Sequence, residues 1–418
     1  MSQSGSPTRG KRRLFYGWIV VAAAFASHLL GYGVVTVAFG VLFPFMAEGL
    51  QLSRGMLAST GVSTRILAGL LAPVMGRVVD RRGPRLVMAI GVASLAIGAV
   101  ILSQAQNVSH IFIGYGVAMA IGFVSLGELT GDTTVARWFV RRRGRALSWA
   151  TMGLSTGGVL LPLPLAYTIT WIGWRGAWLA LGVAIVVIGT AATVAMRSRP
   201  EDSGWTPDGE SGAAGTTRAA AAEAEFTVRQ AVRTAAFWLL VASTNLAALA
   251  LLGSNLHLFS YLGDKGLSPA TAATLVTYLY VLQAVSKPLW GFVTEWMHVR
   301  YCIAICYLGG AVGLVLLIGA SSLSGLFIFS TVYGMTRGAQ AFVTSLAWAT
   351  YFGRSAQGAI RGIAAPFRLA ASAIGPVLGG VLFDLTDNYR LPFTVFAVTF
   401  ALAGLVALAA TPPAAPSA

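Results

Sequence analysis

Apolar segments and short polar segments alternate along the whole chain. The apolar segments are long enough to cross a hydrocarbon core about 30 Å thick as α-helices. A backbone exposed to lipid must satisfy its own hydrogen bonds, so helices are the expected form. The pattern predicts an all-α integral membrane protein with twelve transmembrane helices, at residues 15–42, 55–76, 86–103, 111–133, 146–168, 175–195, 235–257, 268–291, 302–319, 325–349, 361–383 and 391–410.

One longer polar segment interrupts this alternation at residues 197–225, where Gly, Ala, Ser, Glu and Asp dominate. Such a composition is typical of a flexible linker. In the next eight residues, two arginines lie one helical turn apart, as in a short helix at the membrane surface. We therefore expect an N-terminal six-helix half at 1–196, a cytoplasmic linker with an interfacial helix at 197–234, and a C-terminal six-helix half at 235–418.

The two halves repeat one another at a fixed offset of 215 residues. The repeat is carried by small, turn-forming and charged positions, and it keeps one register over more than a hundred residues. Two similar halves that face each other across a central path are typical of a membrane transporter. The matched residues are Leu52-Ser53, Pro73, Gly76, Val78, Asp80, Arg85 and Trp174-Arg175, which recur as Leu267-Ser268, Pro288, Gly291, Val293, Glu295, Arg300 and Tyr389-Arg390.

Composition supports the membrane assignment. The chain is 56% hydrophobic with a mean hydropathy of +0.73, and only 10% of its residues are charged, against about 25% in soluble domains. The net charge of +15 does not indicate a nucleic-acid partner, because the basic residues lie between apolar segments. Most of them fall in alternate loops, which the positive-inside rule places in the cytoplasm. We expect a multi-pass protein of the inner (plasma) membrane with both termini cytoplasmic.

The sequence carries no enzyme-like motif. Cys302 and Cys306 lie one turn apart inside an apolar segment, as packing residues do, and they form no metal-ligand pattern. No nucleophile–base set and no phosphate-binding glycine loop between a strand and a helix is present. We expect no enzymatic activity, no cofactor and no metal.

Residues 76–85 lie between the second and third spans. Their sequence, Gly76-Arg-Val-Val-Asp80-Arg81-Arg82-Gly83-Pro84-Arg85, resembles the cytoplasmic signature loop of the major facilitator superfamily. Gly375-Pro376-Val-Leu-Gly379-Gly380 in span eleven resembles a second element of that superfamily. Together with the repeat, the resemblance covers almost the whole chain and implies the superfamily's transporter fold.

The charges of this loop suggest a conformational gate. Asp80 can pair with Arg81 or Arg85, or it can face a helix N-terminus of the other half. Either contact would hold the cytoplasmic side closed and must break when that side opens. The alternative is a solvated loop end with positive-inside charges. The residues assigned to this gate are Gly76, Asp80, Arg81, Gly83, Arg85 and Glu295.

Three further segments resemble the monocarboxylate and oxalate/formate branch of the superfamily. Tyr16-Gly17-Trp18 resembles its entry to span one, and residues 138–147 (WFVRRRGRAL) resemble its basic stretch before span five. Lys287-Pro288-Leu-Trp-Gly291 resembles the segment that carries the branch's substrate-binding arginine. Here lysine replaces that arginine, Gln283 stands where animal carriers have an aspartate, and Thr36 lies near the place of their span-one lysine. The animal coupling scheme therefore cannot be transferred intact.

Ionisable side chains inside the spans are functional candidates, because each costs at least about 2.5–3.5 kcal/mol near mid-bilayer. The C-terminal half carries Lys287, Arg337 and Arg368 without a mid-span acid, which favours an anionic ligand. Arg337 could instead pair with Glu128 or Asp132, and Arg368 could snorkel or pair at the gate. The predicted substrate-binding residues are the first two cations, their neighbours on the same helical faces and one asparagine of span seven: Lys287, Arg337, Gln283, Tyr333, Gln340 and Asn255.

The N-terminal half carries Glu128 and Asp132 one turn apart in span four. Two carboxyls in an apolar span resist simultaneous ionisation, which suits proton coupling. Alternatively, Asp132 pairs with Arg137 and Glu128 with Arg65 as fixed bridges. His28 in span one is either a proton relay or a hydrogen-bonded packing residue.

Together these features predict a secondary transporter for a small, monocarboxylate-like organic anion, which works by alternating access and proton symport. The expected partners are the anion, protons or a counter-anion, and the lipid bilayer. No nucleic acid is expected, and the protein is expected to be a monomer. An anion exchanger and an exporter of drugs or other amphipathic compounds are alternatives on the same fold. A membrane sensor, which would bind a ligand without moving it, is a third.

Overall fold

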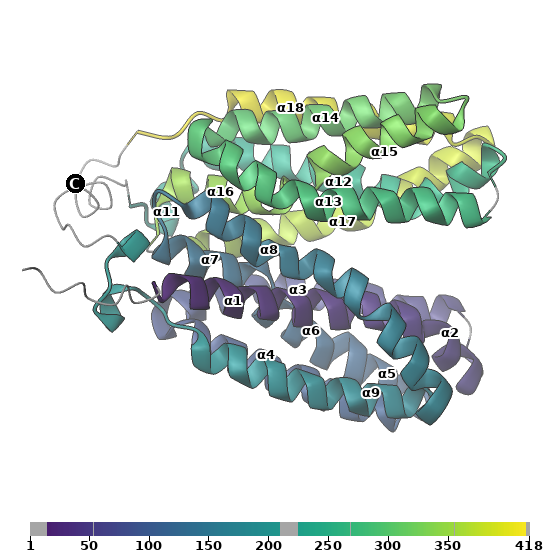
Figure 1. The fold of residues 1–418 in the computed structure, drawn as a ribbon, viewed down its shortest axis with the longest axis horizontal. Coiled ribbons are helices and arrows are strands. Elements are labelled where there is room, and N and C mark those ends of the chain that lie inside the picture. The colour runs from purple at the N-terminus through teal and green to yellow at the C-terminus, as the bar shows by residue number, and fades with distance from the viewer. Residues whose placement is uncertain (1–14, 53, 210–224, 268, 355, 415–418) are drawn as a thin grey trace, which may run out of the picture.

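A computed structural model describes residues 15–52, 54–209, 225–267, 269–354 and 356–414, and the regular structure of this part of the chain is entirely helical. Two helical bundles lie side by side, one from each half of the chain (Figure 1). The N-terminal bundle consists of α1 (Gly17–His28), η1 (Leu29–Ala38), α2 (Phe39–Gly49), α3 (Arg54–Arg82), α4 (Pro84–Ser103), α5 (Val108–Ile111), η2 (Phe112–Met119), α6 (Ala120–Leu126), α7 (Glu128–Trp138), α8 (Arg143–Leu160) and α9 (Pro162–Ala195). The C-terminal bundle consists of α12 (Ala235–Asp264), α13 (Pro269–Trp296), α14 (Val299–Gly319), α15 (Leu323–Arg337), α16 (Gln340–Phe352), α17 (Gln357–Thr386) and α18 (Arg390–Ala409).

Each predicted span coincides with helical structure, but three spans differ in continuity. The sixth span shares α9 with the end of the fifth, and Gly173 breaks α9 between them with φ 70°, a conformation that glycine adopts readily. The fourth span breaks at Gly127, where the backbone is extended before α7. The tenth breaks at Gly338 and Ala339, between α15 and α16. Among the described residues, nine helical segments are long and apolar enough to cross a membrane.

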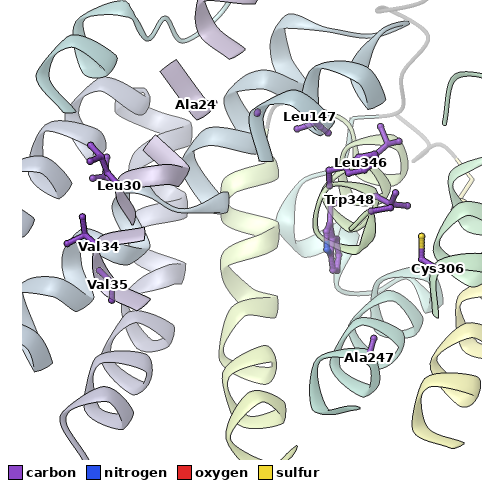
Figure 2. Close-up of a cluster of buried hydrophobic side chains, with 14 of the residues drawn as sticks. Ala24, Leu30, Val34, Val35, Leu147, Ala247, Cys306, Leu346 and Trp348 are labelled. Atoms are coloured by element: carbon purple, nitrogen blue, oxygen red, sulfur yellow. The ribbon is translucent and has the colours of Figure 1, made fainter. Parts of the chain in front are cut away.

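Both bundles are filled by apolar side chains. Figure 2 shows Leu30, Val34 and Val35 in the N-terminal bundle and Leu346 and Trp348 in the C-terminal bundle. All five are buried and belong to one continuous cluster. Because lipid tails are as apolar as these side chains, close packing rather than exclusion from water holds such bundles together.

The bundles meet along two seams. We call the contact of α3 with α17 the first seam and the contact of α8 with α13 the second seam. In the first seam, a Cβ atom on Gly76 would collide with the carbonyl oxygen of Gly358. In the second, a Cβ on Gly291 would collide with the hydroxyl of Ser148. Glycine at these two repeat-related positions therefore permits the close approach of the helices.

The chain between the bundles carries three short helical elements, η3 (Glu201–Ser203), η4 (Pro207–Gly209) and α11 (Val228–Ala231). These elements lie at one end of the molecule, which we call the linker end (Figure 1). The last turns of α3 and α13 and the first turns of α8 and α17 point to this end.

Residues 197–209 of the predicted linker contact the N-terminal bundle at two side chains. The buried carboxylate of Asp208 accepts hydrogen bonds from three consecutive backbone N–H groups, those of Val140 (3.0 Å), Arg141 (2.9 Å) and Arg142 (3.2 Å). Trp205 packs edge-on against Phe15, with ring centroids 5.5 Å apart. These contacts fix the first part of the linker against the segment that leads into α8. Residues 210–224 of the predicted linker lie outside the described residues.

The short helix predicted before span seven is present as one turn. In α11, Thr227 and Gln230 cap each other's backbone N–H groups, which stabilises a helix N-terminus. The backbone N–H of Phe226 donates to the carbonyl oxygen of Phe352 at 3.2 Å, so this turn is tied to the end of α16.

Candidate functional site

Lys287 lies on α13 where this helix faces α8 of the other bundle. Its side chain is buried, with 4% of the residue exposed. The ammonium donates to the carbonyl oxygen of Thr151 and to the hydroxyl of Ser155, both at 2.8 Å. Both acceptors are neutral, and no described carboxylate lies within ion-pair distance. An ammonium has three N–H donors, so a buried positive charge and one donor are available to an anion.

Arg337 ends α15, and its guanidinium lies over two aromatic rings. The distances to the ring centroids are 5.5 Å for Tyr280 and 5.8 Å for Tyr333. Arg337 forms no ion pair with a described residue, so the alternative pairing with Glu128 or Asp132 is not found. Arg337 and Lys287 are close enough for their charges to interact. The two cations therefore lie in one region between the bundles, without an acid bound to either.

The other predicted substrate residues divide into two groups. Gln283 and Gln340 are buried, and their amide nitrogens have no hydrogen-bond partner among the described residues. The hydroxyl of Tyr333 is instead paired with Ser254 of α12 at 2.9 Å. Asn255 is half-buried on the same helix.

The predicted common face of Tyr333, Arg337 and Gln340 crosses the junction of two helices. α15 ends at Arg337 and α16 begins at Gln340. The two residues between them, Gly338 and Ala339, keep right-handed helical backbone angles. The junction therefore does not by itself turn Gln340 away from the face of Tyr333 and Arg337.

The carboxylates of α7 contact the C-terminal bundle. Glu128 accepts from Arg368 of α17 at 2.9 Å. Asp132 lies 3.5 Å from Arg361 of the same helix and accepts a hydrogen bond from Ser345 of α16. Arg368 therefore pairs with a carboxylate of the other half that is not one of the predicted gate residues.

Two expected ion pairs are not formed. Arg137, which we considered as the partner of Asp132, pairs with Asp80 instead. Arg65, considered for Glu128, is exposed on α3. The candidates predicted from the sequence do not include Arg361, which is the first residue of predicted span eleven. Its position two helical turns before Arg368, on the same face, was the available signal.

Asp80 connects the two bundles at the first seam. Its carboxylate accepts from the backbone N–H groups of Gly358 (3.2 Å) and Ala359 (2.7 Å), in the first turn of α17. It also binds Arg137 of its own bundle. The structure thus places Asp80 at a helix N-terminus of the other half, where the helix dipole favours a negative charge.

The other predicted gate residues have different neighbours. Arg85, an expected partner of Asp80, donates instead to the carbonyl oxygens of Val194 and Met196, both at 2.6 Å. Arg81 is exposed. Gly83 precedes α4 with φ 83°, a conformation that favours glycine. Glu295 accepts from Arg145 across the second seam at 2.8 Å.

Comparison with known proteins identifies the family. The model of the major facilitator superfamily matches residues 20–268 and 239–418. The chain belongs to this superfamily. Human monocarboxylate transporter 11 is 26% identical over 391 residues, which cover 90% of this chain and 79% of that protein. The resemblance to the monocarboxylate branch is therefore confirmed.

Solved structures confirm the fold. The proton:xylose symporter XylE, bound to 6-bromo-6-deoxy-D-glucose, superposes with a TM-score of 0.72 at 14% identity, covering 93% of this chain and 94% of that one. The human organic anion transporter MFSD10 gives a TM-score of 0.70 at 17% identity, covering 94% and 99%. The all-α fold of twelve transmembrane helices in two halves is confirmed. This superfamily member is a multi-pass membrane transporter and not an enzyme.

Proposed function

We propose that the protein moves a small, monocarboxylate-like organic anion across the inner membrane by alternating access, in symport with protons. The observation that carries this proposal is the buried ammonium of Lys287, which has only neutral partners among the described residues. Removing a charge from water without a counter-ion is unfavourable. An anion that entered the region between the bundles would restore that balance.

The substrate site we propose contains Lys287 and Arg337 as the anion-binding cations, with Gln283 and Gln340 as amide donors. Tyr333 contributes the ring beneath Arg337, since its hydroxyl is used by Ser254. Asn255 completes the site from α12. A site with two cations and few other charges suits a small ligand that has one carboxylate and whose other groups are polar. The matching relatives are named as monocarboxylate transporters, which supports this substrate class.

Alternating access requires that the two seams open and close. We propose that the linker end faces the cytoplasm, because the basic residues of the predicted cytoplasmic loops gather there. The closed seams then describe a carrier shut towards the cytoplasm. Gly76, Asp80, Gly83, Arg85 and Glu295 form the proposed gate, with Arg81 at its exposed margin.

Two related transport functions, anion exchange and export of amphipathic cations, are distinguished by the uptake experiment described below. An anion exchanger would use the same cations but would require a counter-anion inside the membrane vesicle. An exporter of amphipathic cations would need an intramembrane acid for its substrate. In this chain Glu128 and Asp132 already bind arginines, which favours the anion carrier.

Uptake into proteoliposomes tests the proposal. Labelled lactate, pyruvate, formate, oxalate, dicarboxylates and nitrate are supplied with and without a pH gradient. Hydrogen bonds to charged groups contribute about 1.5–3 kcal/mol, so Lys287→Ala should lower uptake of the accepted anion by roughly 10- to 100-fold. Lys287→Arg, which keeps the charge, should retain part of it.

Lys265→Ala is the matched control. This lysine donates to the carbonyl oxygens of Ile318 and Ala320, away from the seams, and its replacement should leave uptake unchanged. The proposal fails if no anion is taken up, or if Lys287→Ala transports as well as the unaltered protein. Uptake that depends on an internal anion and not on a pH gradient would identify an exchanger.

A further inference from the structure

His28 of α1 and Asp132 of α7 face each other in the N-terminal bundle. Both side chains are fully buried, and His28 Nε2 lies 3.3 Å from Asp132 Oδ1. The ring has room because Gly131 faces it, where a Cβ would contact Nε2 and Cε1, and a Cβ on Gly153 would approach the Cβ of the histidine. His28 is therefore held in place by shape as well as by polar contacts.

The position of one hydrogen follows from the histidine's other nitrogen. His28 Nδ1 lies 3.0 Å from the carbonyl oxygen of Ala150. A carbonyl oxygen can only accept, so Nδ1 carries a hydrogen. This leaves Nε2 and Asp132 Oδ1 facing each other, and neither atom has another hydrogen-bond partner among the described residues. Without a proton, two acceptors would meet in a site that excludes water.

One proton satisfies both atoms. It gives either an imidazolium beside a carboxylate or a neutral imidazole that accepts from a carboxylic acid, and in both forms the pair has no net charge. Loss of that proton leaves the pair with a charge of −1. The His28–Asp132 pair thus has the geometry of a buried site for a single proton.

The second oxygen of Asp132 connects this site to the other bundle. Oδ2 accepts from Ser345 and lies 3.5 Å from Arg361, and the guanidinium of Arg361 also donates to Ser345 at 3.1 Å. The charge of the His28–Asp132 pair therefore sets how strongly α7 is attracted to α16 and α17.

Charged side chains surround the His28–Asp132 pair on several sides. Glu128 of α7 lies one turn before Asp132 and is bound to Arg368 of α17. Lys287 of α13 is close enough to interact with both carboxylates. From α8 the pair meets the Ala150 carbonyl, and from α17 it meets Arg361. The arginines favour the deprotonated pair, whereas Glu128 opposes it.

We propose that His28 and Asp132 bind the proton that is carried with the anion, and that this proton weakens the contact of Asp132 with Arg361 and Ser345. This inference rests on the proposed function and names the proton site within it. Protonation from the side opposite the linker end lowers the attraction across the bundles, so the linker end opens. Release of the proton at the linker end restores the negative charge and draws the bundles together again.

Proton binding and opening of the linker end are coupled in a defined direction. A proton that binds the open linker-end state better than the closed state shifts the population towards opening. The same coupling means that opening at the linker end raises the affinity of the pair for the proton relative to the closed state. The closed, deprotonated form is the one in which Arg361 compensates Asp132 most fully. Anion and proton together therefore promote the transition, while the empty carrier returns without a proton.

Infrared spectroscopy of the purified protein tests the proton site without any substrate. The shared proton gives a carboxyl C=O stretching band when it lies on Asp132 and imidazolium ring bands when it lies on His28, and either band disappears when the proton is lost. We expect a band that titrates with pH, is absent in Asp132→Asn and titrates at a different pH in His28→Gln. Asp264→Asn, an exposed aspartate at the end of α12, is the matched control and should keep the band. The assignment is overturned if the band persists in Asp132→Asn or is removed by Glu128→Gln instead.

Transport measurements test whether this proton is the coupled one. Counterflow of labelled anion needs no net proton movement, whereas uptake driven by a pH gradient does. We expect Asp132→Asn to keep counterflow within about threefold and to lose at least tenfold of the gradient-driven uptake. Retained counterflow also shows that the variant is folded. Gradient-driven uptake equal to that of the unaltered protein would overturn the proposal.

The failure of this inference is distinguishable from failure of the proposed function. If the unaltered protein counterflows anions but neither a carboxyl band nor an imidazolium band responds to His28→Gln or Asp132→Asn, the anion carrier stands and the proton site fails. If the band behaves as expected but no anion is moved, the proposed function fails and the proton site stands as a pH-sensitive contact. Spin labels at Arg77→Cys and Tyr301→Cys, one on each bundle, should then still separate on acidification.

Discussion

The two seams occupy equivalent places in the repeat but are joined by different chemistry. In the first seam, Asp80 binds backbone N–H groups at the start of α17. In the second, the equivalent Glu295 binds the side chain of Arg145, and this pair is partly exposed, with 29% of the arginine side chain and 18% of the glutamate side chain accessible. Backbone donors cannot rotate away, whereas the arginine can. The first seam is therefore the more rigid latch.

At the start of α8, the residue that caps the helix differs from the residue that joins the bundles. The N–H groups that precede α8 are bound by Asp208 from the linker, so Glu295 is not needed there. At α17 the acid that caps the helix and the acid that joins the bundles are the same residue, Asp80. At α8 the two tasks are divided between Asp208 and Glu295. Opening the first seam must uncap a helix, and opening the second need not.

The largest expected effect comes from replacing Gly76 or Gly291 with alanine, which places a methyl group between the closely packed helices of a seam. Gly76→Ala sets a methyl group against the Gly358 carbonyl, which belongs to a helix and cannot move alone. Overpacking of this kind is unfavourable by about 1–3 kcal/mol, so the linker end should open and gradient-driven uptake should fall by roughly 5- to 100-fold. Gly291→Ala meets mainly the Ser148 hydroxyl, which can rotate, so its effect should be several times smaller.

Spin-label distances between Arg77→Cys and Tyr301→Cys measure the opening directly. Gly380→Ala serves as the control, because no atom lies within 4 Å of the added methyl group. Equal effects of the alanines at positions 76 and 291 would contradict the idea that the first seam is the more rigid.

Neutralising the two seam acids should give the next largest effect. Asp80→Asn removes the charge that binds two N–H groups and Arg137 but keeps an amide oxygen as an acceptor. A neutral hydrogen bond is weaker than a charge-assisted one by about 1–1.5 kcal/mol, so we expect a roughly tenfold shift towards the open linker end. Glu295→Gln breaks a partly exposed ion pair, of a kind worth about 0.2–1 kcal/mol, so the shift should be about fivefold at most.

Ionic strength distinguishes the buried contact of Asp80 from the partly exposed pair of Glu295 and Arg145. Screening acts on exposed pairs and much less on buried ones. Raising the ionic strength should therefore reduce the difference between Glu295→Gln and the unaltered protein, while the effect of Asp80→Asn persists. An Asp80→Asn effect that vanished in high salt would place this contact in the same class as the second seam.

The fold could be predicted from the sequence because its signals are long and repeated. Apolar segments located the helices, and the 215-residue repeat, with Gly76 and Gly291 at matching positions, related the two halves. The identities of the candidate residues followed from the rarity of charges in membrane spans. Lys287 and Asp132 stood out for that reason alone.

The partners of these residues could not be predicted, since they depend on distances between the halves. For Asp80 the sequence left two alternatives, the neighbouring arginines or a helix N-terminus of the other half, and the structure has the second, at α17, some 280 residues away in sequence. Arg361 was not among the candidates because it is the first residue of span eleven, where the positive-inside rule already accounts for an arginine. Asp208 was overlooked because its ligands are backbone N–H groups, which leave no mark in composition. A polar segment is therefore not a flexible one where the fold offers it unpaired donors.

The smallest expected effect concerns the contact of Asp208 with the start of α8. It tests how the start of α8 differs from the start of α17. Asp208→Asn keeps the size of the side chain but removes the charge that holds Val140, Arg141 and Arg142. A neutral amide oxygen holds backbone N–H groups less strongly than a carboxylate does, here by about 0.5–2 kcal/mol. Because Asp208 does not join the bundles, this change should loosen the start of α8 without opening the first seam. Hydrogen exchange at residues 140–142 should accelerate by roughly 2- to 30-fold, while spin labels on the two bundles keep their distance and uptake falls by less than about threefold. If the labels instead separate as far as they do in Asp80→Asn, the cap of α8 is part of the latch, and the division of tasks between Asp208 and Glu295 is wrong.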